Sequence, residues 1–213
     1  MSDSVSSEFH PSALDAVNEA LVSIGEGYQL TVLSKTAGRD VPNAANSRAA
    51  AYVYESALDA ILTAHPWTFL MTRKRVTATP DANMWRVKRP ADALTIIGFE
   101  NEVGDRLEYI SEGDDLRLYE VPRSIIYLRQ ENDLTVFPRR IRSLLVKRLA
   151  FDLANPNSGS KDELKVQYEL YTQLLNEAKV WDTRQNKTNR KRVRNHIADV
   201  VRGDAPIDGE DWY

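Results

Sequence analysis

The chain has 213 residues, 42% of them hydrophobic, so it is long enough to bury one sizeable core. It contains no cysteine, which excludes disulfides, thiolate nucleophiles and cysteine-ligated zinc. The formal net charge of -3 indicates no particular partner, and no apolar stretch approaches the roughly 20 residues that a membrane-spanning helix needs.

The N-terminal part of the chain predicts two helices. Residues 1–11 are Ser-rich and acidic and lack the basic and apolar regions of a signal peptide, so we expect no export. Apolar residues recur at helical spacing over 12–24, and Gly25 suits a C-terminal cap. A longer, Ala-rich helix is predicted from about Pro42 to His65.

Two aromatic residues follow that helix in the sequence Pro66-Trp67-Thr68-Phe69, and we expect them to anchor its end in the core. From about Arg73 the pattern changes to short β-prone segments with turn signals between them. These segments are 85–87, 94–99, 106–110, 116–119 and 124–130. They predict a small antiparallel sheet of four to five strands within residues 73–136.

Helical periodicity returns at Pro138, a good first-turn residue. Ser160-Lys161-Asp162-Glu163 then matches a capping box that would begin the last helix. From residue 186 the chain is too polar to fold alone, so we expect a tail that is disordered or folds on a partner.

The expected fold class is therefore α+β, mainly an α-helical bundle with an inserted small antiparallel β-sheet and an extended C-terminal tail. The helical bundle domain comprises residues 1–72 and 137–185. The inserted β domain comprises 73–136, and the flexible C-terminal tail comprises 186–213.

The sequence offers little catalytic chemistry. The three histidines, His10, His65 and His196, lie in three different regions, so we predict no metal site. Adjacent carboxylates such as Asp114-Asp115 lie in turn contexts, and no nucleophile elbow, phosphate-binding loop or zinc-protease motif occurs. We expect no enzyme and no cofactor, and an unrecognised hydrolase is the weakest alternative.

Basic clusters offer a different kind of function. From Arg184 to Asn195 the chain has six basic residues and no acidic one. Two further clusters, Arg73-Lys74-Arg75 and the group Arg139, Arg140 and Arg142, could also neutralise phosphates. A nucleic-acid-binding module that acts through the basic C-terminal segment is therefore the main alternative, although no aromatic residue is interleaved there for stacking.

The order of these features resembles the tail tubular protein A family, the head-to-tail adaptors of short-tailed bacteriophages. The resemblance rests on Ala16–Glu26, the long Ala-rich helix with its Pro66-Trp67-Thr68-Phe69 close, Leu149–Ala154, and Ala178-Lys179-Val180-Trp181-Asp182. It covers about residues 12–185, and the tail matches no family motif.

The resemblance implies a structural virion protein, made in the cytoplasm of the host bacterium and located at the phage head-tail junction. It implies a homo-oligomeric ring, dodecameric in this family, between the portal protein and the tail nozzle protein. DNA would pass through the ring's lumen without sequence-specific binding, and no membrane is involved. Ring contacts would be heterologous, with two different patches on each subunit.

In this family the C-terminal segment typically reaches the portal. Basic residues of the tail would pair with an acidic portal surface, and apolar ones would fill pockets. The portal-docking residues that this predicts are Arg190, Lys191, Arg192, Arg194, Ile197, Val200, Trp212 and Tyr213.

Overall fold

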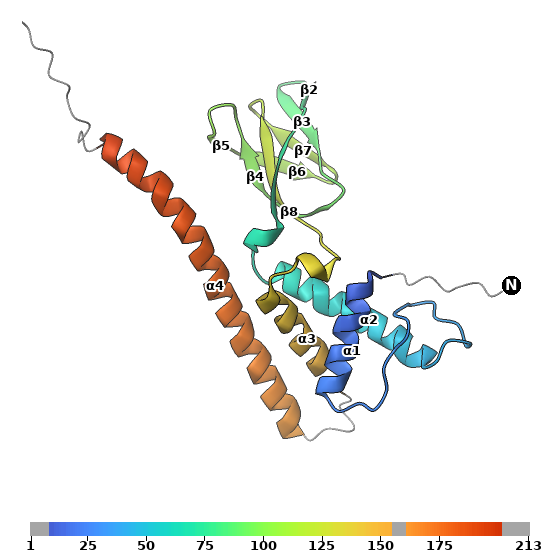
Figure 1. The fold of residues 1–213 in the computed structure, drawn as a ribbon. Coiled ribbons are helices and arrows are strands. Elements are labelled where there is room, and N and C mark those ends of the chain that lie inside the picture. The colour runs from blue at the N-terminus through green and yellow to red at the C-terminus, as the bar shows by residue number, and fades with distance from the viewer. Residues whose placement is uncertain (1–8, 155–160, 202–213) are drawn as a thin grey trace, which may run out of the picture.

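The computed structural model describes residues 9–154 and 161–201, with the side chains of 9–154 and 164–185. Its helices are α1 (Pro11–Ser23), α2 (Ala44–Thr63), α3 (Arg139–Leu153) and α4 (Lys161–Val201), with short 3-10 turns η1 (Thr68–Leu70) and η2 (Leu134–Val136). The strands are β1 (Met71–Arg75), β2 (Thr79–Asp81), β3 (Met84–Lys88), β4 (Ala93–Glu100), β5 (Arg106–Leu107), β6 (Tyr109–Glu112), β7 (Asp115–Leu118) and β8 (Ser124–Arg129). Figure 1 shows α1, α2 and α3 at one end of the molecule and the strands at the other, with α4 running along one side.

The four helices form what we call the helical unit, and α3 packs against the other three. α1 and α2 begin and end within two residues of their predicted bounds, because their apolar positions recur every three to four residues. The small side chains Ala13, Ala16 and Ala20 are buried, which lets α1 approach its neighbours closely. Side chains from all four helices enter one core, including Val17, Ile61, Leu145 and Tyr171.

The strands form two four-stranded antiparallel sheets, which together we call the β unit. One sheet has the order β1-β8-β4-β5 and the other β2-β3-β7-β6. Side chains from both sheets make a second core, in which Phe99, Leu116, Leu118 and Ile125 are fully buried. The β unit is therefore a small two-layer structure with its own core.

The predicted fold class is wrong in its balance of helix and strand. The chain is 45% helix and 22% strand, an α+β protein with two sheets rather than a mainly helical bundle with one small sheet. Two strands carry no apolar alternation. β1 is largely basic and exposed, and it becomes a strand by pairing along its length with β8, from Met71 opposite Leu128 to Arg75 opposite Ser124. β2 has only three residues, one of them Pro80.

The expected extended tail is also corrected over part of its length. α4 continues to Val201, so the backbone of residues 186–201 is helical. Lysine, arginine and glutamine favour helix even where they bury nothing, and α4 contains neither proline nor glycine. Its 41 residues span about 60 Å. Among the helices that the structure describes, none is both long and apolar enough to cross a bilayer.

Candidate functional site

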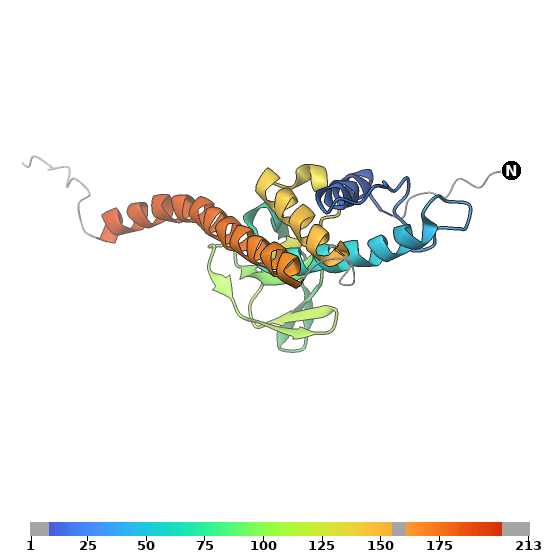
Figure 2. The same cartoon turned by 90° about the horizontal axis from the view of Figure 1, so that it is seen from below.

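The C-terminal part of α4 projects beyond the rest of the described molecule. Figures 1 and 2 show α4 passing alongside α3 and then continuing clear of both the helical unit and the β unit. Six of the predicted docking residues lie on this projecting part, although their side chains are outside the described set: Arg190, Lys191, Arg192, Arg194, Ile197 and Val200. Trp212 and Tyr213 lie outside the described residues altogether.

A buried carboxylate fixes α4 to the rest of the chain before it projects. Asp182 is fully buried, and it accepts hydrogen bonds from the Thr68 backbone N–H at 3.1 Å and from the Thr68 hydroxyl at 2.5 Å. The His65 Nε2 lies 3.2 Å from the other carboxylate oxygen. We call these three residues the Asp182 anchor. A buried carboxylate needs several partners of this kind, and here they come from one turn of chain after α2.

The aromatic residues after α2 complete that attachment. Trp67 is fully buried, and its indole N–H donates to the Ile61 carbonyl oxygen at 2.7 Å. The ring of Phe69 lies 5.1 Å from that of Phe137. The prediction that these aromatics anchor the helix end in the core is confirmed.

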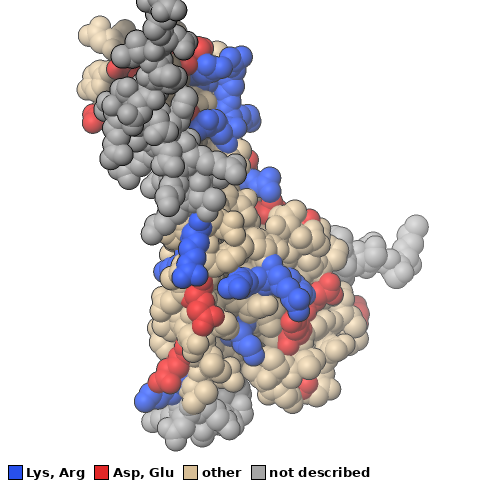
Figure 3. Space-filling view, turned by 60° about the vertical axis from the view of Figure 1, so that its left-hand side comes forward, with Lys and Arg blue, Asp and Glu red and all other residues tan. Residues whose placement is uncertain are grey.

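The structure places two basic clusters in different settings. Arg73 on β1 forms an ion pair with Glu100 at 2.9 Å. Arg140, in the first turn of α3, lies over the Trp181 ring of α4 at 6.0 Å, and Arg142 pairs with Glu19 at 3.0 Å. Figure 3 shows Lys and Arg side chains gathered across the middle of one face, interrupted by carboxylates. An aromatic ring from α4 thus lies beside the arginine cluster of α3.

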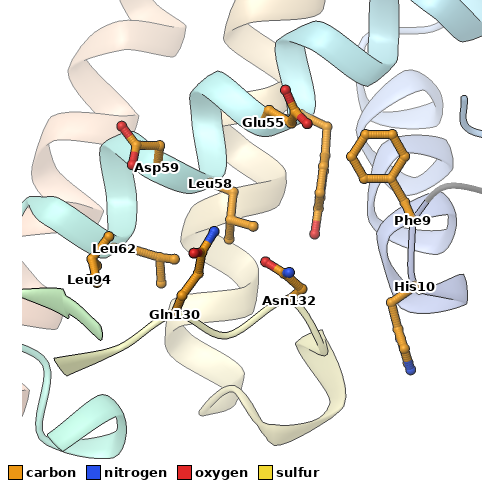
Figure 4. A pocket seen from close by; sticks show the side chains of 10 residues that line it. Phe9, His10, Glu55, Leu58, Asp59, Leu62, Leu94, Gln130 and Asn132 are labelled. Carbon is orange, nitrogen blue, oxygen red and sulfur yellow. The ribbon is translucent and has the colours of Figure 1, made fainter. Parts of the chain in front are cut away.

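A cavity of about 350 Å³ lies where α2, the start of α1 and the segment after β8 meet. This volume is at the small end of the range for ligand pockets. Apolar side chains form part of the wall, and polar ones complete it: Phe9, Leu58, Leu62 and Leu94, with His10, Tyr54, Glu55, Asp59, Gln130 and Asn132. Figure 4 shows Gln130 and Asn132 directed from the segment after β8 toward Leu58 on α2.

The Tyr54 hydroxyl is the most unusual group at this cavity. Tyr54 is 2% exposed, and its hydroxyl has no hydrogen-bond partner among the described residues. Burial raises the pKa of this phenol far above its ordinary value, so the group stays neutral. A buried hydroxyl without a partner is costly, and such groups are few in native proteins.

The cavity was not predicted from the sequence. Its residues come from four separate stretches, and each reads locally as ordinary: Tyr54 and Leu58 as a helical core face, and Gln130 and Asn132 as a loop. Only the packing of α2 against the segment after β8 brings them together. In the described part of the chain, no three His, Asp or Glu side chains converge as metal ligands would.

Two residues considered in the sequence analysis, the carboxylate Asp115 and the histidine His10, have charged or polar partners in the structure. Asp115, at the start of β7, forms ion pairs with Lys88 at 2.9 Å and with Arg86 at 3.8 Å. His10 lies 2.7 Å from the Ser12 hydroxyl and 3.4 Å from Asp133. These contacts give the carboxylates of Asp115 and Asp133 a structural role.

Comparison with known proteins adds no relative: no family model matches the chain, and no curated protein matches it. The functional argument therefore rests on the residues and the geometry.

Proposed function

We propose that the chain is a structural protein of a tailed-phage virion, the head-to-tail adaptor that forms a ring between the portal and the tail nozzle. The observation that carries the proposal is the long helix α4, held at the Asp182 anchor and projecting beyond the body of the molecule. A helix that extends past its own core has surface to offer to other chains.

The anchor also supports the resemblance on which the proposal rests. The Trp67-Thr68-Phe69 close of α2 and the Trp181-Asp182 end of the last resembling stretch lie 114 residues apart in sequence. In the folded chain they bond directly through Thr68 and Asp182. Two segments chosen for their likeness to one family are thus parts of a single contact.

The test is the mass of the purified protein, alone and after mixing with the portal protein encoded by the same genome. The adaptor proposal expects a ring in at least one of the two conditions, visible also by electron microscopy. Monomers in both conditions, without a portal complex, would overturn it.

Portal docking by the C-terminal segment is a separate part of the proposal. Replacing Trp212 and Tyr213 together by alanine should remove portal binding and leave any ring contact intact. A matched control replaces the exposed Tyr119 of the β unit by alanine, which should bind the portal as the unaltered chain does. Undiminished portal binding by the double variant would refute this assignment.

For the nucleic-acid alternative, which acts through the basic C-terminal segment, the described side chains offer no observation, but a second basic cluster on α3 offers one. Arg139 and Arg140 are exposed in the first turn of α3, where the helix dipole disfavours cations, so an external anion would relieve that cost. Phosphate binding predicts an affinity for free DNA that falls steeply as salt is raised. The adaptor proposal instead expects little affinity for free DNA at physiological salt.

A further inference from the structure

The cavity beside α2 carries two polar groups without a partner in the described chain. The Tyr54 hydroxyl has no hydrogen-bond partner there. The Asp59 carboxylate lines the cavity and forms no ion pair within the described residues. Its neighbour Glu55 already pairs with Lys35 at 2.5 Å, so Asp59 is the carboxylate left to receive a charge.

The chemistry of the walls selects a long cationic side chain. No lysine or arginine lines the cavity, and of its two carboxylates Glu55 is paired with Lys35, so the charge that favours a cation there is that of Asp59. The amide oxygens of Gln130 and Asn132 can accept from the cation's N–H groups. Leu58 and Leu62 offer an apolar surface to an aliphatic stem, as lysine and arginine side chains require.

The chain itself contains a segment of the required charge. The basic stretch opens at Arg184, which is exposed on α4, and it holds six cations and no carboxylate up to Asn195. It lies on the projecting part of α4, whereas α2 and the start of α1 lie across the helical unit from it in both views of the ribbon. A molecule therefore presents its basic stretch and its acidic cavity on different sides.

We propose that the cavity receives the first two cations of the basic stretch, Arg184 and Lys187, from α4 of a neighbouring copy of the chain. Repeating this contact joins each molecule to the next head to tail, through two different patches. Such a heterologous contact forms a ring when the rotation between copies closes. The inference rests on the proposed function and names the subunit contact of its ring.

The test uses two variants of the full-length chain, each with one half of the contact reversed. Asp59→Lys alters the cavity and keeps the basic stretch, while Arg184→Glu with Lys187→Glu alters the basic stretch and keeps the cavity. Each alone should associate about 100-fold more weakly than the unaltered chain, the size expected for breaking a close charge pair. An equimolar mixture should assemble again, because both kinds of contact between unlike copies pair opposite charges.

Masses are measured under the conditions, with or without portal, in which the unaltered chain assembles. Glu108→Lys, which makes the same change at an exposed carboxylate of the β unit, is the matched control and should assemble normally. If Asp59→Lys assembles as well as the control, the inference is overturned and the adaptor proposal stands. If the unaltered chain never assembles, the adaptor proposal itself has failed.

Tyr54→Phe supplies a second readout that separates binding from folding. Removing a buried hydroxyl without a partner should leave the melting temperature of the unassembled chain unchanged or raise it. Because the hydroxyl is buried away from the open cavity, association should stay as it is in the unaltered chain, which makes Tyr54→Phe a control for changes in folding. Association weakened as much as in Asp59→Lys would instead show that changes in the core, and not a charge contact, govern assembly.

Discussion

At the scale of single residues, the fully buried Asp182 has the largest effect that we expect of any charged side chain. It accepts from two donors of Thr68 and lies against His65, so Asp182→Ala leaves partly buried donors without an acceptor. We expect the free energy of unfolding to fall by about 3 kcal/mol, measured by urea denaturation.

Two controls define the origin of that loss. Asp182→Asn keeps one carbonyl acceptor and should lose about half as much. Glu177→Ala, at an exposed position one turn earlier on α4, should change stability by less than about 0.5 kcal/mol. Equal losses of unfolding free energy for Asp182→Ala and Glu177→Ala would contradict the stabilising role of the Asp182 anchor.

Two carboxylates tie stability to acid pH. The hydrogen bond from Lys88, helped by Arg86 and Arg117, lowers the pKa of Asp115 below 3.8 despite desolvation. Hydrogen bonds from the Thr135 N–H and hydroxyl lower the pKa of Asp133 in the same direction. A lowered folded-state pKa means that each contribution is present above pH 3.8 and is lost as the pH falls through the folded-state pKa.

The expected result is a stability that declines below about pH 4 and declines less in the double variant Asp115→Asn with Asp133→Asn. Urea denaturation at pH 7 and at about pH 3 measures the difference. The variant should be less stable than the unaltered chain at pH 7, and the gap should narrow in acid. A gap that is the same at both pH values would count against these two residues.

At the scale of elements, the turn between β2 and β3 holds an avoidable strain. Ala82 has φ of +53°, a left-handed conformation that costs an L-residue about 1 kcal/mol or more. Ala82→Gly should therefore stabilise the chain by about 0.5 kcal/mol after the extra entropy of glycine in the unfolded state is counted. Ala91→Gly, at an exposed turn with ordinary φ, is the control and should not stabilise. Comparing the melting temperatures of both variants with that of the unaltered chain tests this prediction.

How far the elements could be predicted depended on whether a local pattern determined them. α1, α2 and α3 followed apolar periodicity closely, and β4 and β8 followed their apolar runs. β1 could not be seen in this way, because its basic side chains are exposed and pairing with β8 makes it a strand. The second half of α4 was misjudged because polar composition was taken as evidence against helix, although it argues only against burial.

The candidate site was less predictable than the fold. Trp67 and Phe69 stood out because aromatic residues after a helix end usually enter the core. Asp182 carried no such signal, since its partner Thr68 is distant in sequence. The cavity at Tyr54 depends on contacts between four stretches, so no local pattern contained it.

At the scale of the whole molecule, the C-terminal part of α4 runs clear of both the helical unit and the β unit (Figures 1 and 2). The last residue of the helical core is Ala178, and Asp182 is the last buried residue in the part of the chain that the structure describes. Deleting residues 186–213 should therefore change the free energy of unfolding by less than about 0.5 kcal/mol while removing portal binding. Deleting residues 164–213 takes Tyr171, Ala178 and Asp182 away and should lower the free energy of unfolding by about 5 kcal/mol or more.

The attachment of α4 has a mechanical consequence. Beyond Asp182 the helix runs on for about 28 Å, so it works as a lever whose fulcrum is the contact with Thr68. A tilt of about 10° at that fulcrum swings the far end by about 5 Å. Because η1 runs directly into β1, we expect the same tilt to move the sheet β1-β8-β4-β5. Seating the tip of α4 on another protein and setting the angle of the β unit are then one movement.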